Sequence, residues 1–167
     1  MVYRRYRRPL GRSRYVLPKR TKYSVEQNTF QVTLPTTQIN NLNQTALQLV
    51  EPIAIQGMRK VKHLMVNLAL TGTTNNDTMN PLYWAIVYVP QGTTVGNMQL
   101  NGTMYEPNQY VMNCGVVDPT AGPIRFSSPL SRNLNSGDAI YLLVGVNNQS
   151  TMGLNVNGCS KYAITLN

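Results

Sequence analysis

The chain has little of what most enzymes, metal sites and secreted scaffolds need. Its 167 residues include one histidine, two cysteines and six acidic residues. Cys114 and Cys159 are too few for a disulfide scaffold, and both lie in apolar, strand-like runs, so we expect buried free thiols rather than a bridge. No group of histidines and cysteines has the spacing of a zinc site. We therefore expect no cofactor.

Recognisable catalytic patterns are also missing. His63 lies beside two lysines, and no carboxylate or nucleophile is close to it in the sequence. There is no glycine-rich phosphate loop, serine elbow or spaced pair of carboxylates. Three loop acids have the chemistry to bind calcium at a subunit contact, but such residues are more often turn formers: Asp77, Asp118 and Asp138. We expect a surface or hydrogen-bonded histidine and no enzyme.

Long hydrophobic segments are absent. The longest apolar runs, Leu82–Val89 and Ala139–Val146, have eight residues each, whereas a membrane helix needs about 18. The basic start of the chain is not followed by an apolar segment, so we expect no secretory signal. A membrane partner is not expected either.

The charge that is present is concentrated at one end. Lysine and arginine total 15, and the net charge is +9. Nine of the basic residues precede Tyr23 with no acid among them: Arg4, Arg5, Arg7, Arg8, Arg12, Arg14, Lys19, Arg20 and Lys22. The six remaining basic residues are matched by six acids. The sequence therefore divides into a cationic arm, residues 1–22, and a formally neutral body, residues 23–167.

The composition of the arm is suited to single-stranded nucleic acid. Arginine presents a fixed fork of donors that matches two phosphate oxygens, and it keeps its charge. Tyr3, Tyr6 and Tyr15 are interleaved with the arginines, and aromatic rings among cations stack on unpaired bases. Pro9 and Pro18 disfavour a helix. We predict a flexible arm that binds phosphates with little sequence specificity. A solubilising tail or a nuclear-import signal alone stays open as the alternative, and import signalling can coexist with nucleic-acid binding.

The body has the pattern of an all-β domain. Leu64, Val66 and Leu68 share one parity of their segment and the other parity carries His63 and Asn67, as in a half-buried strand. Leu82–Val89 and 140–146 are apolar on both faces, which is typical of central strands whose second face is covered by other chain segments or by a neighbouring subunit. The approximate predicted strands are 24–34, 45–50, 59–70, 82–89, 108–117, 123–128, 139–147 and 159–166.

Eight strands in about 145 residues, with turn residues between them, favour a two-sheet antiparallel sandwich. A single eight-stranded jelly roll satisfies the count. An immunoglobulin-like sandwich competes less well, because it prefers seven strands and the Cys–Trp–Cys spacing is missing. The connection of about 18 residues from Pro90 to Pro107 is long for an unstructured loop, so we expect a short helical turn near Thr93–Gln99.

Several segments together resemble the capsid proteins of circovirus-like small circular single-stranded DNA viruses. They are MVYRRYRRP at the start, RKVKHLMVNLAL at 59–70, YWAIVYVPQGTT at 83–94, MYEPNQYVM at 104–112 and RFSSPLSRNLNSGDAIYLLV at 125–144. The resemblance implies a jelly-roll subunit and a T=1 icosahedral capsid of about 60 copies. It also implies that the arm binds packaged DNA. This role falls on Arg4, Arg5, Arg7, Arg8, Arg12 and Arg14, followed in the sequence by Lys19, Arg20 and Lys22.

The same resemblance implies a location in the virion, and in the host nucleus during assembly. Its expected partners are further copies of the chain, single-stranded DNA, a nuclear-import receptor and a host-cell attachment receptor. Two alternatives stay open. One is the capsid protein of a satellite-type RNA virus, because the arm chemistry does not separate RNA from DNA. The other is a basic-tailed β-sandwich that binds nucleic acid or carbohydrate and does not assemble.

Overall fold

The computed structural model describes residues 22–34, 42–54, 56–72, 81–98, 110–118, 122–147 and 154–166. Every regular element within these ranges is a β-strand, and they contain no helix able to cross a membrane. The strands are β1 (Ser24–Leu34), β2 (Leu42–Val50), β3 (Arg59–Gly72), β4 (Leu82–Val89), β5 (Tyr110–Val117), β6 (Ile124–Ser128), β7 (Arg132–Leu134), β8 (Ala139–Asn147) and β9 (Leu154–Leu166). The predicted all-β class is confirmed.

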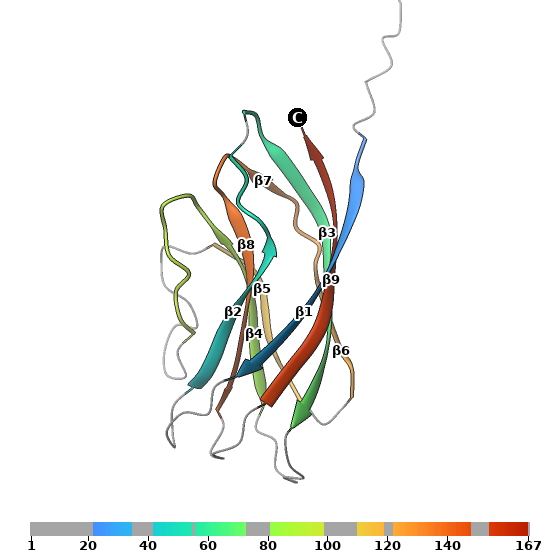
Figure 1. Ribbon diagram of the computed structural model, residues 1–167, viewed down its shortest axis with the longest axis vertical. Helices are drawn as coiled ribbons and strands as arrows, with labels where there is room; N and C mark the ends of the chain where they lie inside the picture. Colours follow the sequence, from blue (N-terminus) through green and yellow to red (C-terminus); the bar gives the residue numbers. More distant parts are fainter. Residues whose placement is uncertain are drawn as a thin grey trace, which may run out of the picture.

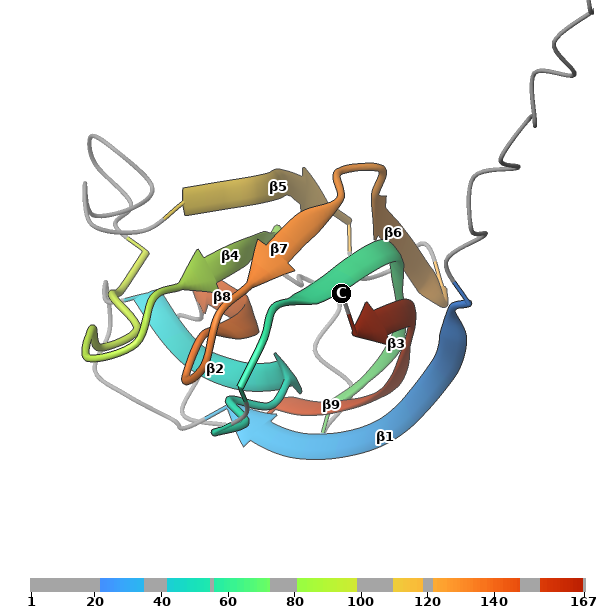
Figure 2. The same cartoon turned by 90° about the horizontal axis from the view of Figure 1, so that it is seen from above.

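The strands form two antiparallel sheets that face each other (Figure 1). Sheet A has the order β1-β9-β3-β6, and β7 also pairs with β3. Sheet B has the order β2-β8-β4-β5. Seen from above, the two sheets curve around a common interior (Figure 2). The predicted two-sheet antiparallel sandwich is therefore confirmed.

The strand pairs are nested within one another along the chain. β4 pairs with β5, β3 with β6 and β7, β2 with β8, and β1 with β9. The outermost pair brings together the two ends of the described chain, since Ser24 is opposite Ile164. The start of β1, where the arm is attached, consequently lies beside the end of β9.

Side chains on the inward faces of the strands fill the space between the sheets. Leu64, Val66 and Leu68 are at most 2% exposed, as their alternation predicts. From the opposite sheet, Trp84 stacks on Phe126 with ring centroids 4.3 Å apart and planes 8° apart. The interpretation of Trp84 as a core residue is confirmed. Each buried side chain of this size stabilises the fold by roughly 1.5–3 kcal/mol.

β3 changes the face that it buries at His63. Arg59 and Val61 are buried before this point, and Leu64 is buried after it, so the inward positions switch from odd to even. His63 itself has a φ of 53°, and the pairing register with β9 shifts by one residue there. This is a β-bulge, which inserts one residue into one strand of a pair. The burial of even-numbered positions, predicted from Leu64, Val66 and Leu68, therefore applies only after the bulge, and before it the odd-numbered positions are buried.

The segment that contains Val95 and Met98 covers part of the outer face of sheet B. β4 and β8 are central strands, as their apolar sequences predict. Met98 is 3% exposed and packs with Val87 and Leu143 on this outer face. The Met98 backbone N–H donates to Gln44 Oε1 at 2.7 Å, which anchors the segment. Gly145 makes room for it, because a Cβ there would lie 2.9 Å from Met98 Cε.

The predicted helical turn near Thr93–Gln99 is wrong for residues 93–98, and Gln99 lies outside the described residues. The Thr93 backbone N–H donates to Pro90 O at 3.2 Å and closes a turn. The chain then continues without helical structure to Met98. Val95 and Met98 of this non-helical segment pack on the apolar outer face of sheet B.

The prediction of buried thiols is also wrong. Cys114 is exposed and Cys159 is half-buried, and both are free. A register shift between β4 and β5 places Gly115 against the ring of Trp84, so its neighbour Cys114 faces outward. Cys159 has the outward parity of β9, where its Sγ lies 3.8 Å from Asn67 Nδ2.

The described residues contain nine strands rather than the eight predicted. The extra strand is β7, which follows β6 after a break at residues 129–131. Pro129 contributes to the break because proline has no N–H for the ladder. Both short strands pair with the same neighbour, β3, in the same direction. They therefore occupy one position in sheet A.

Candidate nucleic-acid interface

Most of the predicted binding residues lie outside the described part of the chain. These are Tyr3, Arg4, Arg5, Tyr6, Arg7, Arg8, Arg12, Arg14, Tyr15, Lys19 and Arg20. Lys22 is described, and it is exposed immediately before β1. The structure therefore locates the root of the arm, Lys22, and the described residues around it.

The root of the arm is held by contacts to β9 and β3. Ser24 Oγ donates to Ile164 O at 3.2 Å. Lys62 Nζ lies 4.5 Å from the centre of the Tyr23 ring, a distance at which a cation is attracted to the face of an aromatic ring. These contacts fix the point at which the arm leaves the sandwich.

Other cations of the body lie at the same level of the molecule. Ser24 is opposite Ile164, Ile164 is opposite Val61, and Val61 is opposite Arg132, so these four residues form one row across sheet A. Lys60 and Lys62 are the residues before and after Val61 along β3, so each lies one position from this row. The predicted binding set missed these body cations, because only strand pairing brings Arg132 beside Lys60 and Lys62 and places all three at the level of the arm's root.

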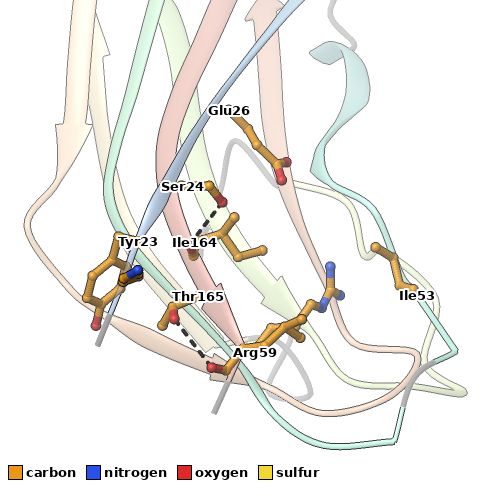
Figure 3. Close-up of a pocket in the computed structure, with 9 residues that line it drawn as sticks. Tyr23, Ser24, Glu26, Ile53, Arg59, Ile164 and Thr165 are labelled. Atoms are coloured by element: carbon orange, nitrogen blue, oxygen red, sulfur yellow. Dashed lines mark hydrogen bonds between the residues drawn. The ribbon is translucent and has the colours of Figure 1, made fainter. Parts of the chain in front are cut away.

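A groove of about 540 Å³ lies at the root of the arm (Figure 3). Its lining residues are Lys22, Tyr23, Ser24, Glu26, Ile53, Arg59, Ile164, Thr165 and Leu166. Glu26 Oε2 accepts a 2.6 Å hydrogen bond from Tyr162 Oη. Burial, together with this bond to Glu26, raises the pKa of Tyr162. The groove contains both charge signs and exposed apolar groups, so its chemistry is not that of a simple phosphate site.

Arg59 is a buried residue at the end of the sandwich where this groove lies. It is only 3% exposed, and its Nη2 donates to Glu51 O at 2.8 Å and to Asp138 O at 3.2 Å. Its Nε is buried and has no hydrogen-bond partner within the described residues. Two backbone carbonyls therefore hold this cation in a structural position, tying the β2–β3 connection to the start of β8.

Asp138 organises the neighbouring turn. Its carboxylate accepts hydrogen bonds from Tyr88 Oη at 2.7 Å, Asn135 N at 2.7 Å and Gln91 N at 3.0 Å. Burial alone would raise the pKa of Asp138, but these bonds outweigh it and hold the pKa below the ordinary value. Burial and the same carboxylate raise the pKa of Tyr88. These bonds support the interpretation of Asp138 as a turn former.

Arg132 lies against two aromatic rings. Its guanidinium carbon is 4.1 Å from the centre of the Tyr88 ring and 5.0 Å from that of Tyr110. A cavity of about 360 Å³ beside it is lined by Lys60, Tyr88, Ser131, Arg132, Asn133 and Asn135. These lining residues include two cations, several neutral donors and no acid. The cavity therefore has the chemistry to accept an anion.

The remaining residues singled out from the sequence have structural or surface positions. His63 is exposed at the β3 bulge. Asp118 is exposed just after β5 and Asp77 lies outside the described residues. Within the described ranges no three histidine, cysteine, aspartate or glutamate side chains are grouped so as to hold a metal ion.

No protein-family model matches the chain, and no curated protein matches it at a significant level.

Proposed function

We propose that the chain is the capsid protein of a small circular single-stranded DNA virus of the circovirus-like group. In this proposal the body is a jelly roll that assembles into a T=1 icosahedral shell. The arm lies inside the shell and binds the packaged DNA, and it directs the protein to the host nucleus for assembly.

The strand order is the observation that carries the jelly-roll part of the proposal. Strands from the two halves of the chain pair in nested fashion, and the pairs alternate between the two sheets. If β6 and β7 are counted as one interrupted strand, the order is that expected of an eight-stranded jelly roll. This architecture is common among viral capsid proteins, and also among lectins.

The surface of the body supports assembly. Large apolar side chains are exposed on β5, on the β6–β7 connection and at the end of β9: Val116 is 53% exposed, Leu130 52% and Leu166 68%. Exposed apolar groups are suited to contacts between subunits. The formal neutrality of the body means that many copies can be crowded together with little mutual repulsion.

The charge distribution supports packaging. Nine arm charges precede a neutral body, and the root of the arm lies at the level of Lys60, Lys62 and Arg132. A polyanion bound by the arm would therefore meet further cations where the arm joins the sandwich. Phosphate contacts of this kind give affinity without reading the sequence of the bases.

The proposal is tested by purifying the full chain and typing the nucleic acid that it protects. We expect closed shells in electron micrographs, with deoxyribonuclease-sensitive DNA released after disruption. Ribonuclease-sensitive nucleic acid instead would favour the satellite-type RNA virus. Monomers that bind nucleic acid without forming shells would favour the non-assembling module.

A matched pair of variants tests the role of the arm. Replacement of Arg4, Arg5, Arg7, Arg8, Arg12 and Arg14 by glutamine should leave the shell domain folded and remove most of the packaged nucleic acid. Replacement of the same six residues by lysine keeps the charge and should retain most of the packaging. Equal nucleic-acid content in both variants would contradict the proposed role.

A further inference from the structure

The outward face of sheet A carries four cations from three strands. Lys60 and Lys62 lie on β3, Lys161 on β9 and Arg125 on β6. Lys161 and Arg125 are exposed, and the two β3 lysines are half-buried. We call this group the cationic face. Four of the six basic residues of the body belong to it.

Strand register brings two of these cations together in the middle of the sheet. Met65 of β3 is opposite Lys161, and the next outward residue, Asn67, is opposite Arg125. Arg125 Nη2 lies 2.8 Å from Met65 Sδ. Because neighbouring strands are about 4.8 Å apart, Lys161 and Arg125 flank β3 from its two sides.

The bulge at His63 contributes to this arrangement. Lys60 and Lys62 face outward before the bulge, and Met65 and Asn67 face outward after it. Without the extra residue, β3 could not present both lysines and bury Leu64 on the same strand. The cationic face therefore follows from a specific irregularity of β3, together with the strand order.

The described acids do not lie on this face. Glu26 has the opposite parity on β1 and accepts a hydrogen bond from Tyr162. Asp138 is buried immediately before β8 of sheet B. Glu51 lies in the β2–β3 connection, and Asp118 follows β5 of sheet B. The residues around the four cations include uncharged hydrogen-bonding groups, such as the exposed Gln27 of β1.

The cationic face is continuous with the root of the arm. Lys62 belongs to the face and contacts the Tyr23 ring at the start of the body. Val25 of β1 is opposite Ala163, which is opposite Lys62, so all three lie in one row on the outward side. A strand of nucleic acid held by the arm can therefore pass directly onto sheet A.

We propose that single-stranded nucleic acid lies across the outward face of sheet A, with phosphates on Lys60, Lys62, Arg125 and Lys161. This inference rests on the proposed nucleic-acid-binding function and gives it a second site, on the folded body. Charge complementarity favours a polyanion over a neighbouring subunit. The chain has only six acids, and two of them, Glu26 and Asp138, are already engaged within the sandwich.

The test compares two full-length variants that each lose four charges. The face variant carries Lys60→Gln, Lys62→Gln, Arg125→Gln and Lys161→Gln. The arm variant carries Arg4→Gln, Arg5→Gln, Arg7→Gln and Arg8→Gln. Binding of a labelled oligothymidylate is measured over a salt series, and the slope of log K against log salt counts the phosphate contacts. Four lost contacts should make the slope shallower by about 2.8.

We expect a similar loss of slope in both variants. A charge-conserving variant with Lys60→Arg, Lys62→Arg, Arg125→Lys and Lys161→Arg should keep the original slope, which separates charge from packing. An unchanged slope in the face variant, with a reduced slope in the arm variant, would overturn the inference and leave the proposed function intact. Unchanged slopes in both variants would overturn nucleic-acid binding by either element.

If the cationic face instead contacts a neighbouring subunit, the face variant will keep its slope for oligothymidylate but fail to form particles. That result would also overturn the inference. Far-ultraviolet circular dichroism of each variant shows whether the β-sandwich is retained, so that a folding defect is not mistaken for lost contacts.

Discussion

At the scale of single residues, Asp138 is a loop acid whose hydrogen bonds hold several segments of the chain together. Its carboxylate joins Tyr88 on β4, Gln91 after β4 and Asn135 before β8. The sequence pattern indicated a turn, which the bond from Asn135 closes, but Tyr88 and Gln91 are 50 and 47 residues away. The distant partners could not be predicted, because they depend on how β4 and β8 pair.

The bonds to Asp138 predict a pH dependence of stability. The folded pKa of Asp138 is lowered, so its stabilising contribution is complete above the unfolded pKa of about 3.9 and is lost as the pH falls through the lower, folded pKa. Asp138→Asn should therefore be less stable at pH 7 and lose less stability on acidification below about pH 4. Urea unfolding followed by the fluorescence of the one tryptophan, Trp84, measures this. Parallel acid profiles for both proteins would contradict it.

Gly158 predicts a second effect at this scale. A Cβ at this position on β9 would lie 2.5 Å from Asn67 O and 2.7 Å from Phe30 Cζ. We expect Gly158→Ala to lower the free energy of unfolding by about 1–3 kcal/mol, because the backbone of β3 or the ring of Phe30 must move. Urea unfolding provides the value. Gly92→Ala is the control for the loss of a glycine, since nothing lies within 4 Å of a Cβ there, although its φ of +80° adds some strain.

At the scale of elements, much of the fold could be predicted from alternation and apolar runs. The central positions of β4 and β8 follow from their two apolar faces, and the inward stripe of β3 follows from its period of two. The bulge at His63 was missed because its trace in the sequence is only the three-residue spacing of Val61 and Leu64, which strand pairing is needed to identify as a shift. The outward position of Cys114 was missed for the same reason, since a register shift in β5 determines it.

The segment that covers sheet B predicts a stability effect. Met98 is 3% exposed against Val87 and Leu143, so Met98→Ala removes the cover and leaves a cavity. We expect a loss of about 2 kcal/mol or more in the free energy of unfolding. Thr94→Ala, at an exposed site on the same segment, should change stability by less than about 0.5 kcal/mol. Equal effects of the two substitutions would mean that the segment does not protect the sheet.

At the scale of the whole molecule, the separation of a cationic arm from a neutral body was visible in the sequence. The position of Lys22 and Tyr23, where the arm joins the body, relative to the body cations was not. That position depends on the pairing of β1 with β9 and of β9 with β3, which are far apart along the chain. The concentration of basic residues in the arm could therefore be predicted from the sequence, but the surface that the body cations form could not.

The charge of the proposed shell predicts an under-neutralised interior. About 60 copies would carry about 540 arm charges, and the cationic face would add about 240, if all groups met phosphate. A coding sequence for 167 residues alone takes about 500 nucleotides, and a genome that also encodes a replication protein is considerably longer. We expect more phosphate than protein cation in purified particles, with polyamines or metal ions making up the difference. Chemical analysis of phosphate, protein and small cations provides the ratio, and equal charges without added cations would contradict the prediction.

The most direct test of the capsid proposal is sedimentation velocity of the full-length chain, recorded at 260 and 280 nm. The proposal predicts a single boundary in the megadalton range whose absorbance ratio shows bound nucleic acid. A boundary at the 18.7 kDa of the monomer, unchanged by salt and by added DNA, would contradict it.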